Sequence, residues 1–211
     1  MSSILRRPFR YTFNNATLIL ICINVIVYML ERLVPEVMYY LSLNVYNCLG
    51  AKMFWQPFTY MFVHGNFQHI LFNMLGLFFF GLSVERAIGS KEYLLLYFLT
   101  GTLCGLSSLV FYFFTGLFNV FMLGASGVVY ALLLSYAVIF PRNRIYIWGL
   151  IPVPAPILVL AYAIIEFASQ VLGTRNGIAH SVHLAGFFFA WMYFLIRMGV
   201  NPVKVWKDAY R

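Results

Sequence analysis

Charged residues are scarce in this chain: Asp, Glu, Lys and Arg together make up 9% of its 211 residues. A soluble domain carries roughly 25% charged residues, so this scarcity excludes that class of protein. Hydrophobic residues occupy 63% of the chain instead. The composition therefore predicts an all-α membrane protein with several spans, whose first partner is the lipid bilayer.

The sequence also contains few cysteines and lacks the usual metal-binding motifs. The three cysteines, Cys22, Cys48 and Cys104, have no metal-like spacing, and two of them lie inside apolar runs. We therefore assign them to packing and not to a disulfide framework. The zinc-protease pattern H-E-x-x-H is absent, and no acidic residue lies near any of the four histidines in the sequence. We expect no metal ion and no cofactor.

Apolar stretches long enough to cross a bilayer, which takes about 20 helical residues, occur six times. They are approximately residues 15–33, 67–84, 92–114, 123–140, 147–172 and 178–198. No small-residue cleavage site follows the first stretch, so we expect it to remain as a span. The chain is expected to form one membrane domain, 1–211, with its core at about 15–198. A basic N-terminal segment, 1–14, precedes the core, and a short C-terminal tail, 199–211, follows it.

The only long connection between spans, at about 34–66, carries two charges, Glu36 and Lys52. It is rich in aromatic residues, among them Tyr39, Tyr40, Tyr46, Phe54 and Trp55. Aromatic side chains of this kind favour the headgroup level of a bilayer. We therefore expect this loop to lie partly in the membrane interface.

Basic residues outnumber acidic residues by 14 to 6. They are scattered over short loops and tails without a clustered patch, which argues against nucleic acid as a partner. Membrane orientation explains the excess better. Eleven basic residues fall on one side of the predicted spans, and three, Arg32, Lys52 and Arg175, fall on the other. The positive-inside rule then places both termini in the cytoplasm.

With this orientation, three spans begin at the outer face with polar residues at one common depth. These are His64, Asn66, Gln68, His69 and Asn73 at span two, Ser126 at span four, and His180, Ser181 and His183 at span six. Polar groups are costly in a bilayer, and they either hydrogen-bond a neighbouring helix or line a functional cavity. Convergence from three separate helix ends favours the second interpretation.

Ser126 and His183 are a candidate nucleophile and general base. A serine hydroxyl is a weak nucleophile until a base removes its proton, and histidine suits that task at neutral pH. Both helices present small residues, which allow close packing: Gly124, Ala125 and Gly127 around Ser126, and Gly186 with Ala190 on span six. If those faces pack, the two side chains can approach hydrogen-bonding distance.

A tetrahedral intermediate also needs hydrogen-bond donors for its oxyanion. His69 and Asn73 are four residues apart, hence on one helix face. They can supply such donors together with the unpaired N–H groups at the start of span four. Tyr130, four residues after Ser126, either stacks on His183 or is an ordinary core or interface aromatic.

These residues form an ordered set of motifs that resembles the rhomboid family of intramembrane serine proteases. In chain order, the motifs are HGNFQHILFN with His69 and Asn73, GLSVERAIG with Glu85 and Arg86, GASG with Ser126, then Tyr130, and HLAG with His183 and Gly186. Each motif alone is weak evidence, whereas the ordered set covers roughly residues 15–198. The resemblance implies a six-transmembrane-helix bundle with both termini cytoplasmic.

The resemblance also implies roles. Ser126 would be the nucleophile and His183 the general base, a dyad without an aspartate, and His69 with Asn73 would bind the oxyanion. The other matches would be supporting or structural: Tyr130 at the histidine ring, Gly124, Gly127 and Gly186 as packing positions, His64 as a structural histidine, and Glu85 with Arg86 as a cytoplasmic-end motif. No cofactor is implied.

By the resemblance, the substrates are transmembrane proteins cut near the outer membrane face. Because no targeting element is recognised in the sequence, we expect a plasma or inner membrane, with an organelle membrane as the alternative. Span four would be a short central helix below a water-filled pocket, and span five and the first loop would face the substrate. The first loop lacks the family's frequent Trp-Arg pair, and Ala190 stands where glycine is usual. His180 has no assigned role. Glu166, near the outer end of span five, would pair with Arg175 or Gln170, or face the pocket.

Three other functions compete with the serine protease. A metal-dependent intramembrane protease would use the histidines as ligands and would respond to a chelator. A catalytically inactive rhomboid-like scaffold would be indifferent to Ser126→Ala. A small transporter would be expected to show inverted repeats, which we do not find. Neither the natural substrate nor the oligomeric state can be read from the sequence.

Overall fold

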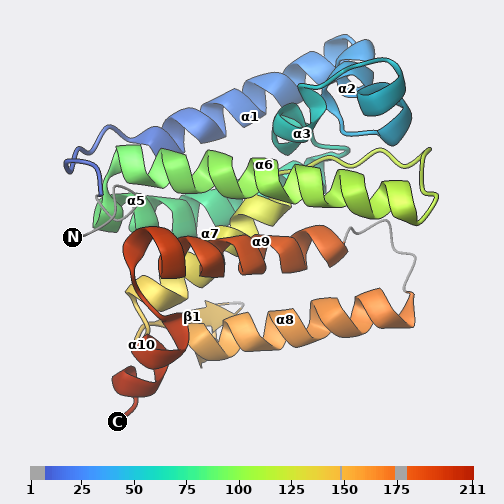
Figure 1. Ribbon diagram of the computed structural model, residues 1–211. Coiled ribbons are helices and arrows are strands. Elements are labelled where there is room, and N and C mark those ends of the chain that lie inside the picture. Colours follow the sequence, from blue (N-terminus) through green and yellow to red (C-terminus); the bar gives the residue numbers. More distant parts are fainter. Residues whose placement is uncertain (1–7, 148, 174–179) are drawn as a thin grey trace.

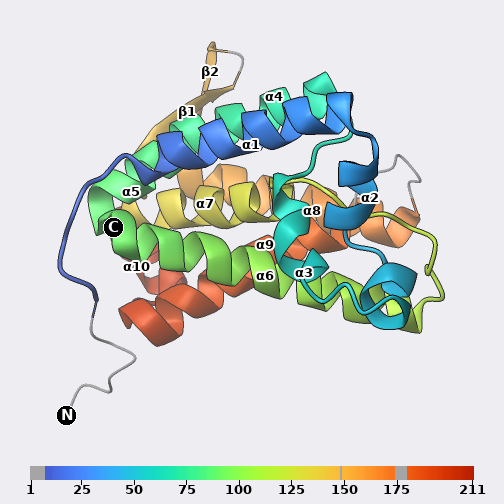
Figure 2. The same cartoon turned by 90° about the horizontal axis from the view of Figure 1, so that it is seen from above.

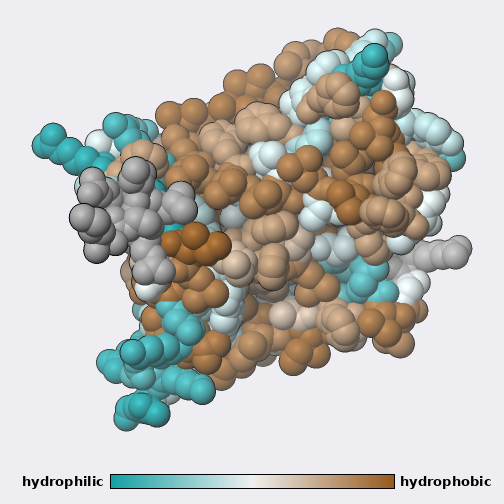
Figure 3. Space-filling model, viewed as in Figure 1, coloured by the Kyte–Doolittle hydropathy of each residue, from teal (hydrophilic) through white to brown (hydrophobic). Residues whose placement is uncertain are grey.

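The computed structural model describes residues 8–147, 149–173 and 180–211 and is mostly helical (Figure 1). Within these residues, five helical segments are long and apolar enough to cross a membrane. They are α1 (Ala16–Leu33), the run of α4 (Phe67–Gly76), η4 (Leu77–Gly81) and α5 (Leu82–Ile88), α6 (Ser90–Phe114), α8 (Ala155–Leu172), and α9 (His180–Tyr193) with η5 (Phe194–Met198). Apolar residues cover most of the face in Figure 3. The protein is an integral membrane protein with several spans.

The predicted fourth span is shorter than the others. The sequence predicted a helix over about 123–140, whereas α7 has 14 residues, Ser126–Ile139, and is about 21 Å long at 1.5 Å per residue. The helix does not begin earlier because Gly124 has a φ of 114°, outside the helical region. A helix of this length cannot cross the roughly 30 Å hydrocarbon core of a bilayer by itself.

Helix α7 is the centre of the bundle. Figures 1 and 2 both show it running between the other helices, and residues such as Ala131 and Leu132 have no exposed surface. Its sequence, SGVVYALLLSYAVI, is apolar on every side, as expected of a helix that is surrounded by other helices. Helix α7 is therefore held by neighbours from several parts of the chain.

The first loop is a folded part of the protein. It forms α2 (Glu36–Leu41), a π-helical turn η2 (Tyr46–Gly50), α3 (Gln56–Thr59) and a 3₁₀ turn η3 (Tyr60–Phe62). The buried Tyr60 hydroxyl donates to the Gly101 carbonyl of α6 at 2.8 Å. Gly105 lets α3 come close, because an added Cβ would lie 2.3 Å from the Pro57 carbonyl oxygen. The aromatic residues expected at the interface are exposed: Tyr39, Tyr40, Tyr46, Phe54 and Trp55.

Residues 144–154 contain a β-hairpin that the sequence did not predict. Strand β1 (Arg144–Ile147) pairs antiparallel with β2 (Ile151–Pro154). The predicted span over 147–172 was therefore wrong at its start, because α8 begins only at Ala155. Pro152 and Pro154 lack a backbone N–H, which opposes a helix interior. In a two-stranded ribbon both strands are edge strands, and these can accommodate proline.

The C-terminal helix α10 (Pro202–Ala209) packs back against the end of α7. Trp206 donates its indole N–H to the Ala137 carbonyl at 2.9 Å, and its ring meets Trp191 edge to face, with centroids 5.8 Å apart. The start of α1 and α10 lie at the same end of the bundle (Figure 1). That arrangement is the one expected if both termini lie on one side of the membrane.

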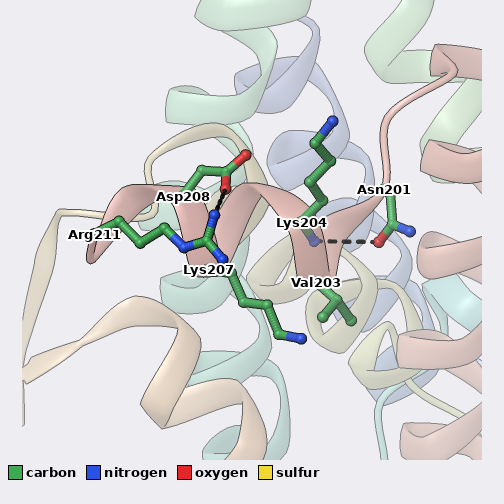
Figure 4. Close-up of a pocket in the computed structure, with 6 residues that line it drawn as sticks. All are labelled: Asn201, Val203, Lys204, Lys207, Asp208 and Arg211. Atoms are coloured by element: carbon green, nitrogen blue, oxygen red, sulfur yellow. Dashed lines mark hydrogen bonds and ion pairs between the residues drawn. The ribbon is translucent and has the colours of Figure 1, made fainter.

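A polar surface hollow lies beside α10 (Figure 4). Asn201 caps the helix by accepting from the Lys204 backbone N–H at 3.3 Å, and Arg211 lies 3.9 Å from Asp208. Lys204 and Lys207 extend away from each other, and their side chains do not converge on one point (Figure 4). Because α10 contacts the C-terminal end of α7, this hollow is remote from the first turn of that helix.

Candidate active site

Ser126 and His183 form a hydrogen-bonded pair. Ser126 is the first residue of α7 and His183 lies in the first turn of α9. Although 57 residues separate them, Ser126 Oγ lies 2.9 Å from His183 Nε2. This is the relationship that a nucleophile needs to its general base. His183 is 8% exposed, while Ser126 is partly exposed, so the histidine is sheltered and the hydroxyl lies at the edge of the buried region.

Close packing of α7 against α9 makes this contact possible. A Cβ added at Gly186 would lie 2.1 Å from the Gly127 carbonyl oxygen, and one added at Gly127 would lie 2.9 Å from a methyl group of Val182. A backbone carbonyl cannot move aside, so Gly186 requires glycine at this helix separation, while a larger residue at Gly127 would need the Val182 side chain to shift. Ala190, the second small residue of the pattern on span six, is fully buried. An alanine is therefore compatible with the helix packing at that point.

The imidazole of His183 is held on two further sides. The ring of Tyr130 lies parallel to it, with centroids 4.2 Å apart and an angle of 8° between the planes. On the edge opposite Ser126, His183 Nδ1 lies 2.9 Å from Glu166 Oε1. An ionised carboxylate only accepts hydrogen bonds, so this contact requires the proton on Nδ1. Nε2 is then free to accept from the Ser126 hydroxyl.

Glu166 reaches this position from α8. Its neighbours Ile164, Ile165 and Phe167 are 57–68% exposed, whereas Glu166 is 5% exposed. The helix thus presents an apolar surface outward and one carboxylate inward. The carboxylate accepts from the Tyr130 hydroxyl through Oε1, and its Oε2 lies 2.5 Å from His180 Nδ1. Three donors from two other helices therefore meet one carboxylate.

Sequence reasoning left Glu166 without a role, and the structure places it beside the candidate base. Of its expected partners, Arg175 lies outside the described residues, while the contacts found are with Tyr130, His180 and His183. Two signals could have identified it. A carboxylate within an apolar span is a functional candidate by default, and His180, three residues before His183, lies on a nearby face of the same helix.

Span two brings His69 and Asn73 to the same end of α7. The His69 ring lies against Gly124, where an added Cβ would come within 2.6 Å of Nε2. With its positive φ as well, Gly124 is a position where only glycine fits. Asn73 is 5% exposed and donates one amide hydrogen to the His69 carbonyl at 2.9 Å. An asparagine amide has two hydrogens, so this contact leaves Asn73 a second one.

His64 belongs to the connection that leads into α4, and it is fully buried. Its backbone N–H donates to Glu31 at 3.3 Å, its Nδ1 lies 3.3 Å from the Phe62 carbonyl oxygen, and the Ala125 N–H approaches Nε2 at 3.5 Å. Burial, with a smaller contribution from His69, lowers the pKa of His64 to about 3. His64 is therefore neutral at working pH and supports the segment that precedes Ser126.

Glu85 and Arg86 lie at the other end of the span from His69. The buried Glu85 carboxylate accepts from the backbone N–H groups of Ala16 at 2.6 Å and Thr17 at 2.8 Å, and from the Ser90 hydroxyl at 2.5 Å. The first N–H groups of a helix have no acceptor within it, so the Glu85 carboxylate supplies the hydrogen-bond acceptors that the start of α1 lacks. Arg86 is exposed. These two residues are remote from the Ser126–His183 pair.

The same side chains also have the composition of a metal site. One potential ligand atom from each of Glu166, His180 and His183 lies within 4.8 Å of the others. The sequence argument against a metal was that no acidic residue lies near the histidines, and the tertiary structure places Glu166 there. Glutamate and histidine are both common zinc ligands, so a metal-dependent reaction needs a direct test.

Comparison with known proteins yields matches over most of the chain. A model of the Rhomboid domain matches residues 51–199. "Rhomboid protease GlpG" of Haemophilus influenzae is 28% identical over 172 residues, which cover 81% of this chain and 84% of that protein. "RHOMBOID-like protein 12, mitochondrial" of Arabidopsis thaliana is 33% identical over 145 residues, covering 61% and 42%. "Putative rhomboid protease YdcA" of Bacillus subtilis is 29% identical over 135 residues, covering 64% of each protein.

Proposed function

The chain belongs to the rhomboid family, and we propose that it is a serine endopeptidase that hydrolyses peptide bonds of transmembrane proteins. Ser126 is the nucleophile and His183 the general base. The observation that carries this proposal is the distance of 2.9 Å between Ser126 Oγ and His183 Nε2. Relatives from Haemophilus influenzae and Bacillus subtilis are named as proteases, which supports the same chemistry.

The reaction proceeds in two halves. Ser126 Oγ bonds to the scissile carbonyl carbon while its proton passes to His183 Nε2, and the π electrons of the carbonyl move onto its oxygen. The intermediate collapses as the C–N bond breaks and His183 gives the proton to the leaving nitrogen. Water then attacks the acyl-enzyme with His183 again taking a proton. Ser126 leaves with that proton, and the new carboxyl terminus is released.

The oxyanion is stabilised by donors at the start of α7. The first N–H groups of this helix have no partner within it, and the positive end of the helix dipole points to the same place. His69 lies against Gly124, two residues before Ser126, and the second amide hydrogen of Asn73 is a further donor. Preorganised donors of this kind are typically worth about 3–4 kcal/mol each in the transition state.

The site is oriented toward the extracytoplasmic side, with both termini in the cytoplasm. The excess of basic residues on the side of the termini supports this orientation, as does the position of α10 at the end of the bundle where α1 begins. A fluorescent reporter that folds only in the cytoplasm, fused after Arg211, is expected to be active. Activity of a periplasm-dependent reporter at that position would reverse the orientation.

Substrates are single-span proteins cut near the outer membrane face. An intact transmembrane helix keeps its carbonyl groups hydrogen-bonded, so the scissile segment must leave the helical conformation before attack. Helix-stabilising substitutions near the cut are therefore expected to slow cleavage. Equal cleavage of stabilised and unstabilised substrates would contradict this part of the proposal.

The test is cleavage of a model single-span substrate by purified protein in detergent or liposomes. Ser126→Ala is expected to lower the rate by about 1,000-fold or more. Ser83→Ala is the matched control, because the Ser83 hydroxyl donates to the Phe79 carbonyl one turn earlier in the same helical run, and it is expected to retain full activity. Cleavage by Ser126→Ala at the wild-type rate would overturn the proposal and point to another nucleophile, whereas no cleavage by the wild-type protein would favour an inactive scaffold.

A chelator separates the serine protease from a metal-dependent one. Because the proposed steps use only Ser126 and His183, dialysis against EDTA is expected to leave the rate unchanged. Loss of activity that returns when Zn²⁺ is added would favour a metal held by Glu166, His180 and His183, whose potential ligand atoms lie close enough together for that role.

A further inference from the structure

We propose that Glu166 is a positioning residue for His183, so that the site is a Ser–His–Glu triad and not a dyad. This inference rests on the proposed function, since it assigns a role to Glu166 in the same reaction. The sequence-based expectation was a dyad without an aspartate, with the role of Glu166 left open. The geometry instead places a carboxylate oxygen 2.9 Å from the imidazole nitrogen that does not contact Ser126.

The contacts of His183 are the ones that a general base needs. With its proton on Nδ1 donated to Glu166, the ring presents the Nε2 lone pair to Ser126. When Nε2 takes the serine proton, the ring becomes positively charged beside a negative carboxylate, which stabilises that state. The Tyr130 ring covers one face of the imidazole and limits its rotation. The ring is therefore fixed in both tautomer and direction.

The position of Glu166 argues for a specific role. An ionised carboxylate within a bilayer is costly unless it is paired and hydrogen-bonded, and the outward face of α8 at this level is apolar. Glu166 is nonetheless turned inward and is 5% exposed. Its two oxygens receive hydrogen bonds from Tyr130, His180 and His183, so the cost of burial is met by contacts that converge on the candidate base.

His180 holds the other carboxylate oxygen. Its Nδ1 lies 2.5 Å from Oε2, while His183 contacts Oε1. Two histidines of α9, three residues apart, thus contact both carboxylate oxygens of Glu166, and this fixes the plane of the carboxylate. His180 accordingly acts through Glu166, and its substitution is expected to have a smaller effect than substitution of Glu166 itself.

The test compares Glu166→Gln with the wild type in the cleavage assay. Glutamine has almost the same shape but no charge, so kcat is expected to fall about 10- to 100-fold, with KM changed by less than about twofold because the residue does not touch the substrate. Gln170→Ala is the matched control one turn further along α8, where the side chain is partly buried. It is expected to keep the wild-type kcat.

A spectroscopic measurement on the wild-type protein removes any dependence on the folding of a variant. The NMR signals of ¹⁵N-histidine-labelled protein are recorded at neutral pH. The signals of His183 are identified because they disappear in His183→Gln, and they are expected to show the neutral tautomer with the proton on Nδ1. In Glu166→Gln this preference is expected to weaken. A purely structural Glu166 would leave the tautomer of His183 unchanged.

The outcomes separate the two proposals. If Ser126→Ala abolishes cleavage but Glu166→Gln retains the wild-type kcat, the triad is overturned and the serine protease stands. If Ser126→Ala cleaves normally, the proposed function itself fails. A proton on Nε2 of His183 in the wild type would also overturn the triad. Loss of activity in EDTA that Zn²⁺ restores would overturn both proposals, because Glu166 and His183 would then be metal ligands.

Discussion

The backbone of Gly186 on α9 lies directly against the carbonyl of Gly127 on α7, so closely that an added Cβ would come within 2.1 Å of the carbonyl oxygen. This contact lies one residue from Ser126 and three residues from His183. The separation of the two helices at this point therefore sets the distance between the hydroxyl and the imidazole. Packing and chemistry depend on the same pair of glycines.

Substitution of Gly186 is expected to separate the candidate nucleophile from its base. In Gly186→Ala the new methyl group must push α9 away from the backbone of α7, because a backbone carbonyl cannot move aside as a side chain can. We expect a loss of about 1–3 kcal/mol in stability from overpacking and at least a 10-fold loss in kcat, since small displacements of reacting groups are costly. Thermal unfolding measures the loss in stability, and the substrate-cleavage assay measures the loss in kcat.

Gly50→Ala is the control for this substitution. An added Cβ at Gly50 would meet nothing within 4 Å, and Gly50 lies in the first loop. The variant is expected to behave as the wild type in both assays. Wild-type cleavage by Gly186→Ala would show that the α7–α9 separation does not control the reaction.

Glu85→Gln is expected to destabilise the protein without touching the reacting groups. The glutamine amide can accept fewer of the hydrogen bonds that Ala16, Thr17 and Ser90 now donate. Leaving buried donors unpaired costs about 1–3 kcal/mol. The thermal unfolding midpoint is expected to fall, while the kcat of the fraction that remains folded stays close to the wild-type value.

The exposed Glu36 provides the comparison for Glu85. Because surface substitutions are usually within about 0.5 kcal/mol of neutral, Glu36→Gln is expected to leave the unfolding midpoint unchanged. Equal midpoints for the two variants would show that the bonds from Glu85 to the start of α1 contribute little to stability.

His64 is expected to make the protein less stable as the pH falls. Its pKa is lowered to about 3 in the folded protein, while an unfolded histidine has a pKa near 6.5. Above that pH both states are neutral and stability is complete. Below it the His64 imidazole binds a proton in the unfolded chain but stays neutral in the folded protein, so stability is lost progressively from about pH 6.5 toward pH 3. Thermal unfolding between pH 8 and pH 5 measures this loss.

His64→Gln tests the assignment, because glutamine does not titrate. The variant is expected to be less stable at pH 8, since a buried side chain is replaced, but to lose less stability between pH 8 and pH 5. Glu31 and His69 also lie next to His64 and are unchanged in this variant. An equal loss in both proteins would assign the pH dependence to those neighbours.

Much of the candidate site could be predicted from local sequence patterns. Ser126, His69, Asn73 and His183 are polar residues in the first or second turn of apolar helices, and their recurrence at one depth in three helices made them candidates. The boundaries were harder to predict. The hairpin at residues 144–154 is as apolar as a span, so hydropathy alone extended the fifth helix too far. Backbone hydrogen bonding between the two strands makes this segment a hairpin and not part of the helix, and composition does not reveal such pairing.

Glu166 shows where sequence reasoning stopped. Its burial and its partners depend on how α8 is rotated about its own axis and how far it lies from α9, and both follow from packing between helices. Neither can be read from the spacing of Glu166 to His180 along the chain, because a separation in sequence does not specify how two helices are rotated relative to each other.

The sequence by itself determined that this is a membrane protein of several apolar helices, because a chain with so few charges can bury itself only in lipid. It also determined which helix ends carry polar chemistry, and through the order of its motifs the family to which the chain belongs. Only the tertiary structure decided that α7 begins as late as Ser126, that Gly186 and Gly127 bring Ser126 to His183, and that a carboxylate from α8 reaches the imidazole. These are distances between segments far apart in the chain, and they are set by the packing of whole helices.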